Sequence, residues 1–239
     1  MAIQLPLGIS LRAEASFANY VTVGNEQSVT LLSAPQEVPL GRALDKTSEE
    51  RVIYLWGAHA TGKTHLLQAC CHQRAERNQA VCFIPLAEYH ELDPSMLEGL
   101  ETMDLVCIDD LQAIAGELRW EEALFHLFNR LYDQRKRLIM TASAAPSGLT
   151  LSLNDLTSRL NSALICHLLP LNDAAKLEVL QRRAAEVGME LPLEVGHYLL
   201  RHASRDLTAL LALLQQLDHA SLVRQRRLTI PLVKEVLNA

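Results

Sequence analysis

Short apolar runs recur along the first two thirds of the chain, and each is followed by a longer segment of mixed polarity. Four of them cover residues 52–56, 80–86, 104–108 and 138–142, and a fifth covers residues 163–169. Short apolar runs at this spacing are typical of parallel strands that are buried on both faces. The pattern therefore predicts a parallel sheet.

Helical patterns lie between the runs, notably over residues 65–78 and 120–137. In the second segment Leu124, Phe128 and Leu131 recur at helical spacing and so fall on one face. Parallel strands need crossover connections, and helices supply them on both faces of the sheet. We expect an α/β fold with a doubly wound parallel sheet, whose ligand binds at the carboxyl ends of the strands.

The hydrophobic pattern changes after Pro170, where leucine-rich helical segments replace the strand-like runs. Asn172 and Asp173 offer an N-cap for the first of three or four helices, Ser204 is the expected N-cap of a later one, and Thr229 precedes the last. Leucines at three- and four-residue spacing after Ser204 indicate a helix packed in a small bundle. A small all-helical domain is expected over residues 171–239.

Residues 13–170 are expected to form the α/β nucleotide-binding domain, in which residues 24–50 carry one or two short helices before the first strand. Residues 1–12 contain Pro6 and Gly8 and show no period of a helix or strand, which indicates a tail.

The composition is that of a mildly acidic globular protein. Among 239 residues, 22 are basic and 28 acidic, and 49% are apolar, which argues against disorder and against a basic, nonspecific nucleic-acid binder. There is no long uncharged apolar run, no signal-peptide pattern and no Cys-x-x-Cys pair among the five cysteines. We expect a cytoplasmic protein without a membrane segment.

The sharpest chemical signal is the sequence GAHATGKT at residues 57–64, directly after the first strand-like run. This is a complete P-loop. Its glycines let the backbone wrap a phosphate, its amides and the helix start face the anion, Lys63 reaches the terminal phosphates and Thr64 can hold Mg²⁺. The predicted binding residues are Gly57, Ala58, His59, Ala60, Thr61, Gly62, Lys63, Thr64 and the adjoining His65. The predicted cofactors are ADP or ATP and Mg²⁺, and the loop itself does not select the base.

A pair of carboxylates, Asp109 and Asp110, follows the third apolar run. Acids after a strand are often plain loop residues, but beside a P-loop they form a Walker B pattern. We expect Asp109 to bind in the Mg²⁺ sphere with Thr64, and Asp110 to orient the water that attacks the γ-phosphate.

Three further positions are weaker candidates for the same site. Ser143, with Thr141 beside it, ends the fourth run and is either a catalytic contact or an ordinary strand-end hydroxyl. Arg159 and Arg205 could stabilise the charge that develops on the phosphates, although on position alone each reads as a surface arginine.

Taken together, these blocks resemble an AAA+ nucleotide-binding module, and more narrowly the bacterial DnaA family, over about residues 14–239. The resemblance implies that Phe17 and Tyr20, in EASFANY, pack near the adenine, where the alternative is a loop closing the sheet edge. The motif IDDLQ at residues 108–112 is similar to the family's Walker B. By the same resemblance, Arg159 is an arginine finger acting in trans, and Arg205 is the sensor arginine of the helical lid. Ser143 stands where the family usually has aspartate, which implies weak intrinsic hydrolysis.

No helix-turn-helix region follows the lid, and in this the chain resembles the DnaA-homologous regulators that inactivate the initiator. The tail resembles a clamp-binding peptide, through Gln4, Leu5, Leu7 and Ile9. The resemblance implies DnaA and the DNA polymerase β sliding clamp as partners, a homodimer or higher oligomer, no direct sequence-specific DNA binding and no membrane.

Two functions follow from these features. The first is a regulator of replication initiation that binds nucleotide and the clamp, stimulates ATP hydrolysis by DnaA and prevents re-initiation. The second is a stand-alone AAA+ ATPase or loader, whose own Lys63, Asp109 and Asp110 turn over ATP.

Overall fold

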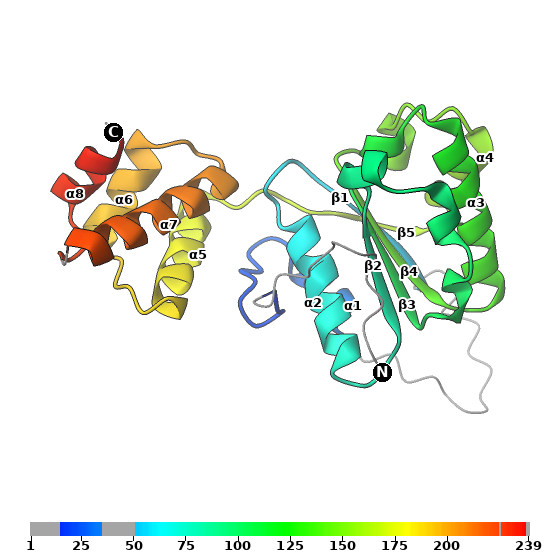
Figure 1. The fold of residues 1–239 in the computed structure, drawn as a ribbon, viewed down its shortest axis with the longest axis horizontal. Coiled ribbons are helices and arrows are strands. Elements are labelled where there is room, and N and C mark those ends of the chain that lie inside the picture. The colour runs from blue at the N-terminus through cyan, green and yellow to red at the C-terminus, as the bar shows by residue number, and fades with distance from the viewer. Residues whose placement is uncertain (1–14, 35–50, 225, 238–239) are drawn as a thin grey trace. The chain divides into compact units, whose positions relative to one another are not determined.

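A computed structural model describes residues 15–34, 51–224 and 226–237. The chain divides into two compact units at Leu169 and Pro170, and residues 21–23 belong with the second unit. Figure 1 shows the sheet of the first unit and the helices of the second.

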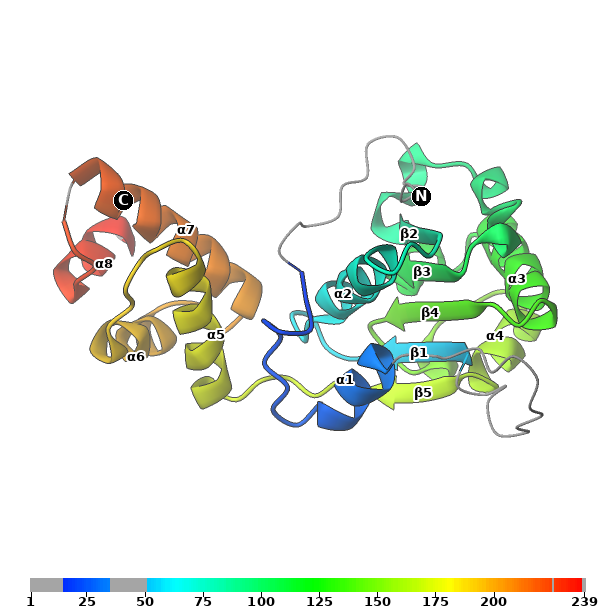
Figure 2. The same ribbon diagram turned by 90° about the horizontal axis from the view of Figure 1, so that it is seen from below.

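The first unit is built on a five-stranded parallel sheet, which confirms the predicted fold class (Figure 2). The strand order is β2-β3-β4-β1-β5, so that β1 lies between β4 and β5. The strands are β1 (Val52–Trp56), β2 (Val81–Pro85), β3 (Leu105–Asp109), β4 (Arg137–Ala142) and β5 (Leu164–His167). Each predicted run coincides with a strand to within two residues at either end. At β3 the shift matters, because Asp109 is the last residue of the strand and does not follow it.

Helices cover both faces of this sheet, as the doubly wound pattern requires (Figure 1). The helices are α1 (Glu26–Ser33), α2 (Lys63–Ala75), α3 (Leu118–Asp133) and α4 (Asn154–Asn161). One apolar core joins α1 and α2 to one face, and a second joins α3 and α4 to the other, because alternate strand residues such as Ile53 and Tyr54 point to opposite sides. Short 3₁₀ turns are η2 (Leu86–Glu91), η3 (Pro94–Leu97), η4 (Leu100–Thr102), η5 (Leu111–Ile114) and η6 (Pro146–Gly148).

The helix boundaries correct the sequence prediction. The helix expected over residues 65–78 is α2, which begins at Lys63 and ends at Ala75, before Asn78 takes a φ of 58°. The helix expected over residues 120–137 is α3, which ends at Asp133; Arg135 has a φ of 55° and Arg137 already belongs to β4. A residue in the left-handed region cannot continue a right-handed helix. The residues predicted beyond the two helices, 76–78 and 134–137, are all polar, so the apolar periodicity does not mark where either helix ends.

Among the residues that the structure describes, the second unit contains helices joined by loops. Its helices are α5 (Asp173–Glu186), α6 (Leu193–His202), α7 (Leu207–Arg224) and α8 (Ile230–Leu237), packed around a leucine-rich core. Asn172 caps α5 as predicted, since its side chain accepts a hydrogen bond from the Ala175 N–H at 2.9 Å. None of the helices in the described ranges of either unit is long and apolar enough to cross a membrane.

The N-cap predicted at Ser204 is wrong. The Ser204 hydroxyl accepts from the Asp206 N–H at 3.2 Å, whereas the Asp206 carboxylate accepts from the Ala209 N–H at 2.9 Å. The cap of α7 is therefore Asp206, because only its side chain reaches an N–H of the first turn.

Candidate functional site

The phosphate loop connects the end of β1 to the start of α2 and is held by the neighbouring strands. The Gly57 N–H donates to the Ala142 carbonyl at 3.3 Å, and a Cβ on Gly57 would lie 2.5 Å from the Leu168 carbonyl oxygen. Gly62 has a φ of 86°, and a Cβ there would lie 2.6 Å from the Tyr20 ring. Both glycines are therefore required by space, and Gly62 also by its backbone conformation.

Lys63 lies over this loop with only 8% of its surface exposed. Its ammonium donates to the Gly57 and Ala58 carbonyl oxygens at 2.9 and 3.0 Å. Burial lowers the pKa of Lys63, and the charges of Asp110 and Asp109 oppose that shift. The loop thus presents a lysine at its mouth together with the amides at the start of α2, which is an arrangement that suits a polyphosphate.

Asp109 meets α2 at the carboxyl end of β3. Its Oδ2 accepts from the Thr64 hydroxyl at 2.6 Å, and its Oδ1 accepts a short hydrogen bond from the Thr141 hydroxyl of β4. Burial raises the pKa of Asp109, and the two hydroxyl donors oppose this. A carboxylate and a hydroxyl oxygen side by side form a hard donor set, so Thr64 and Asp109 fit the predicted Mg²⁺.

Thr141, which the sequence offered beside Ser143 as a catalytic contact or an ordinary strand-end hydroxyl, is a member of this site. It is fully buried, it donates to Asp109, and its oxygen accepts from the Asp110 N–H at 3.0 Å. A hydroxyl inside an otherwise apolar parallel strand was the available signal, because such a group needs a partner.

Asp110 follows with a φ of 58° and is held by a side-chain amide. Gln112 donates to the Asp110 carboxylate at 2.8 Å, and the Gln112 carbonyl oxygen accepts from the Ser143 N–H at 3.0 Å. Ser143 is thus joined to the acid pair through its backbone, and its side chain is exposed. The IDDLQ motif contained Gln112, but spacing alone did not predict this bridge.

The segment expected to pack near an adenine lies against the loop. The Tyr20 hydroxyl donates to the Thr61 carbonyl at 3.0 Å, and burial raises the pKa of Tyr20 to about 12. The His65 ring lies 5.7 Å from the Tyr20 ring, with its Nε2 2.9 Å from the Ser16 carbonyl oxygen. Phe17 is half-buried against the core of the α2 face.

The two arginines lie on different units. Arg159 is exposed on α4, whose Leu156 and Leu160 are fully buried. Arg205 stands two residues before α7 in the second unit, where its guanidinium lies 3.8 Å from Asp173. Of the remaining predicted residues, Ala58, His59, Ala60 and Thr61 lie in the loop, whereas Gln4, Leu5, Leu7 and Ile9 lie outside the described residues.

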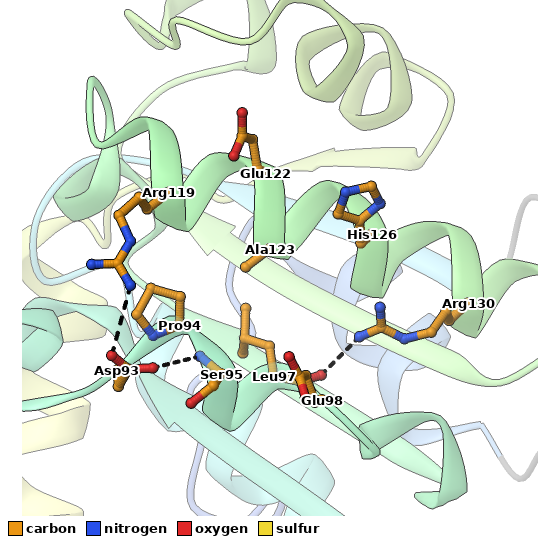
Figure 3. A pocket seen from close by; sticks show the side chains of 10 residues that line it. All are labelled: Asp93, Pro94, Ser95, Leu97, Glu98, Arg119, Glu122, Ala123, His126 and Arg130. Atoms are coloured by element: carbon orange, nitrogen blue, oxygen red, sulfur yellow. Dashed lines mark hydrogen bonds and ion pairs between the residues drawn. The ribbon is translucent and has the colours of Figure 1, made fainter.

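A separate groove lies between η3 and α3 and shares no residue with the phosphate loop (Figure 3). Side chains of both signs line it, including an exposed pair in which Arg119 lies 4.0 Å from Asp93. Because these charges compensate one another, the groove offers no concentrated positive field for a phosphate.

Comparison with known proteins assigns the family. Residues 12–167 match the model of the bacterial DnaA ATPase domain. The chain belongs to the bacterial DnaA family. Within this family, residues 173–237 match the lid domain of Hda, so the second unit is an Hda-type lid.

Solved structures of DnaA share the fold of this DnaA-family chain. Domain III of DnaA from Thermotoga maritima is 21% identical, with a TM-score of 0.79, over 96% of this chain and 98% of that one. AMPPCP-bound DnaA from Aquifex aeolicus is 23% identical, with a TM-score of 0.70, over 88% of this chain and 67% of that one. The RuvB branch migration motor of Thermotoga maritima, at 16% identity and a TM-score of 0.60, is covered over 61% of its length by 79% of this chain.

Proposed function

We propose that this DnaA-family chain is a nucleotide-binding regulator of replication initiation, which stimulates ATP hydrolysis by DnaA and so prevents re-initiation. The observation that carries the proposal is the contrast between two kinds of site residue. Lys63 and Asp109 are buried within the chain's own site, whereas Arg159 is exposed on α4 and available to another molecule. The succession of a DnaA ATPase domain and an Hda-type lid along the chain supports the regulatory role.

The resident ligand is ADP or ATP with Mg²⁺. The binding of AMPPCP, an adenine nucleotide, by the DnaA neighbour supports the nucleotide part of this assignment. The loop amides from Gly57 to Thr64 and Lys63 hold the phosphates, and Thr64 and Asp109 hold the ion, which neutralises phosphate charge when bound. Phe17, Tyr20 and His65 lie beside the loop and are assigned to the adenine side. Arg205, from the lid, is assigned to the phosphates.

Arg159 acts in trans on the ATP of DnaA. Hydrolysis of a phosphoanhydride develops negative charge on the transferred group, and an arginine supplied by a second protein is worth about 10³ to 10⁵ in rate in comparable systems. Asp110 is held by Gln112 and Thr141, and we assign it to water orientation in a weak hydrolysis by the chain itself, together with Ser143.

The decisive experiment measures ATP hydrolysis by purified DnaA with DNA-loaded clamp. It compares no addition, this chain, Arg159→Ala and Arg119→Ala, an exposed arginine of the same unit that serves as the control. Stimulation that is lost only with Arg159→Ala supports the regulator and its finger. Stimulation that survives in Arg159→Ala removes the finger, and no stimulation by the parent chain overturns the regulator.

We assign Gln4, Leu5, Leu7 and Ile9 to the DNA polymerase β sliding clamp, where the leucines would enter an apolar groove. Deletion of residues 1–12 is expected to abolish the clamp-dependent part of the stimulation and to leave nucleotide affinity unchanged. Unchanged clamp dependence would contradict the tether. A cytoplasmic location and a homodimer or a mixed assembly with DnaA complete the proposal, without sequence-specific DNA binding.

The second candidate is a stand-alone AAA+ ATPase or loader. The observation in its favour is the complete acid pair, with Asp109 on Thr64 and Asp110 beside it. Turnover by the chain alone, independent of clamp and DnaA and lost in Asp110→Asn, would favour this function over the regulator.

A further inference from the structure

Glu121 of α3 is a fully buried carboxylate, and within the described part of the chain its side chain accepts from backbone N–H groups. Its Oε1 accepts from the N–H groups of Gly116 and Ser152 at 2.7 and 3.1 Å, and its Oε2 accepts from the Leu153 N–H at 2.7 Å. Burying a carboxylate away from water costs free energy unless the group is well hydrogen-bonded. These three bonds offset the cost of burying Glu121.

The three donors belong to two segments that neighbour candidate site residues in the sequence, Asp110 and Arg159. Gly116 follows η5, the turn that begins directly after Asp110. Ser152 and Leu153 lead into α4, and Leu153 is the residue that precedes the first helical turn. The Leu153 side chain supplies no capping bond, so the anchoring of this end of α4 rests on its backbone and on Glu121.

We propose that Glu121 is a positioning residue, which fixes the start of α4, and with it Arg159, relative to the segment that follows the acid pair. The inference rests on the proposed function, because it gives Arg159 a task in trans that depends on where α4 stands. Leu156 and Leu160 fix the buried face of α4, and the Glu121 bonds fix its start.

The number of bonds explains why a carboxylate is required. Two oxygens accept three N–H groups, whereas a glutamine of the same size has one acceptor oxygen and would turn its own N–H₂ toward a backbone donor. Glu121→Gln therefore keeps the packing volume and breaks the bonds on one side. The matched control is Glu122→Gln, since Glu122 is the next residue of α3, is exposed and lines the groove of Figure 3.

The experiment uses the full chain and measures amide hydrogen exchange residue by residue beside the stimulation of DnaA. In Glu121→Gln, exchange of the Ser152 and Leu153 amides and the first turn of α4 is expected to rise by about tenfold to a hundredfold, the worth of a hydrogen bond to a charged group. Stimulation is expected to fall by about tenfold to a hundredfold, because a misplaced catalytic group is costly in rate. Nucleotide affinity stays unchanged, and Glu122→Gln behaves as the parent.

Arg159→Ala distinguishes loss of the arginine from displacement of α4. This variant is expected to lose the stimulation of DnaA while amide exchange in α4 stays at the rate of the parent chain. Unchanged exchange at Ser152 and Leu153 in Glu121→Gln would overturn the positioning role. Exchange that accelerates equally across the whole sheet would overturn it as well, by making Glu121 a general stability residue.

If Glu121→Gln does not fold, Glu121→Asp retains both oxygens at a shorter reach and is expected to show a smaller rise at the same amides; parent-like exchange there contradicts the proposal. If the parent chain does not stimulate DnaA, the proposed function fails. Amide hydrogen exchange at the start of α4 still tests whether Glu121 fixes that end of the helix.

Discussion

At the scale of single residues, Asp109 combines a buried position with a charge that its site requires. Burial raises its pKa, and the Thr141 and Thr64 hydroxyls only partly offset this. A carboxyl group with a higher pKa in the folded than in the unfolded chain destabilises the fold at high pH, because the folded state binds the proton more tightly. The free energy of unfolding is therefore expected to fall as the pH rises from about 4, the pKa of a free aspartic acid, through the raised pKa of Asp109.

Asp109→Asn tests whether the charge of Asp109 lowers stability while it serves ligand binding. The substitution keeps the size and removes the charge, so the ligand-free chain should melt at a higher temperature at pH 7 and lose this part of its pH dependence, while Mg²⁺-dependent nucleotide binding is lost. Thermal unfolding at pH 5 and pH 8 measures both effects. The control is Asp104→Asn, expected to lower the melting temperature because Asp104 pairs with Lys136 and accepts from the Ala80 N–H. A lower melting temperature for Asp109→Asn would show that its hydrogen bonds outweigh its burial.

At the scale of secondary-structure elements, Asn25 fastens the start of α1 to the chain that leaves β5. Its amide donates to the Leu169 carbonyl at 3.0 Å, and its carbonyl oxygen accepts from the Leu169 N–H at 2.8 Å. Asn25→Ala leaves both backbone groups without these partners, and is expected to lower the free energy of unfolding by about 2–4 kcal/mol. Urea unfolding measures the loss. Thr30→Ala, an exposed position of the same helix, should cost less than about 1 kcal/mol.

The cap of α7 makes a second prediction at this scale. Asp206→Ala removes the side chain that accepts from the Ala209 N–H, and is expected to destabilise the second unit by about 0.5–2 kcal/mol. Ser204→Ala removes a bond outside the helix and should cost less. Amide exchange in α7 distinguishes them, because only the loss of the cap frays its first turn. A larger effect for Ser204→Ala would restore the cap that the sequence suggested.

At the scale of the whole molecule, nucleotide binding should couple to the stability of the chain. A ligand that binds only the folded state at about 100 times its Kd adds about 2.7 kcal/mol to the free energy of unfolding. We expect ADP with Mg²⁺ to raise the melting temperature of the parent chain, and Lys63→Met to abolish the rise. Lys136→Met, whose lysine pairs with Asp104 away from the loop, should retain it. A shift that persists in Lys63→Met would place the nucleotide elsewhere.

The sequence by itself determined the local features of this protein. Apolar runs with intervals of mixed polarity predict buried strands and crossover helices. A strand that is buried on both faces of the sheet needs apolar residues at nearly every position, and this is visible in the sequence. The phosphate loop and the Asp109–Asp110 pair were predictable for a similar reason, since their residue types stand at short fixed spacings beside a strand. Helix ends were less accurate, because left-handed residues such as Asn78 and Arg135 follow each helix within a polar stretch, where no apolar residue marks the end.

Only the tertiary structure decided which distant residues meet. The strand order places β4 beside β3 and β1. Thr141 and Thr64 therefore reach Asp109, although they lie 32 and 45 residues from it in the sequence. Glu121 reads in the sequence as one of two adjacent helical acids, yet it is buried and its neighbour is exposed. A hydrogen bond between segments far apart depends on packing in three dimensions, and single-sequence periodicity carries no record of that packing.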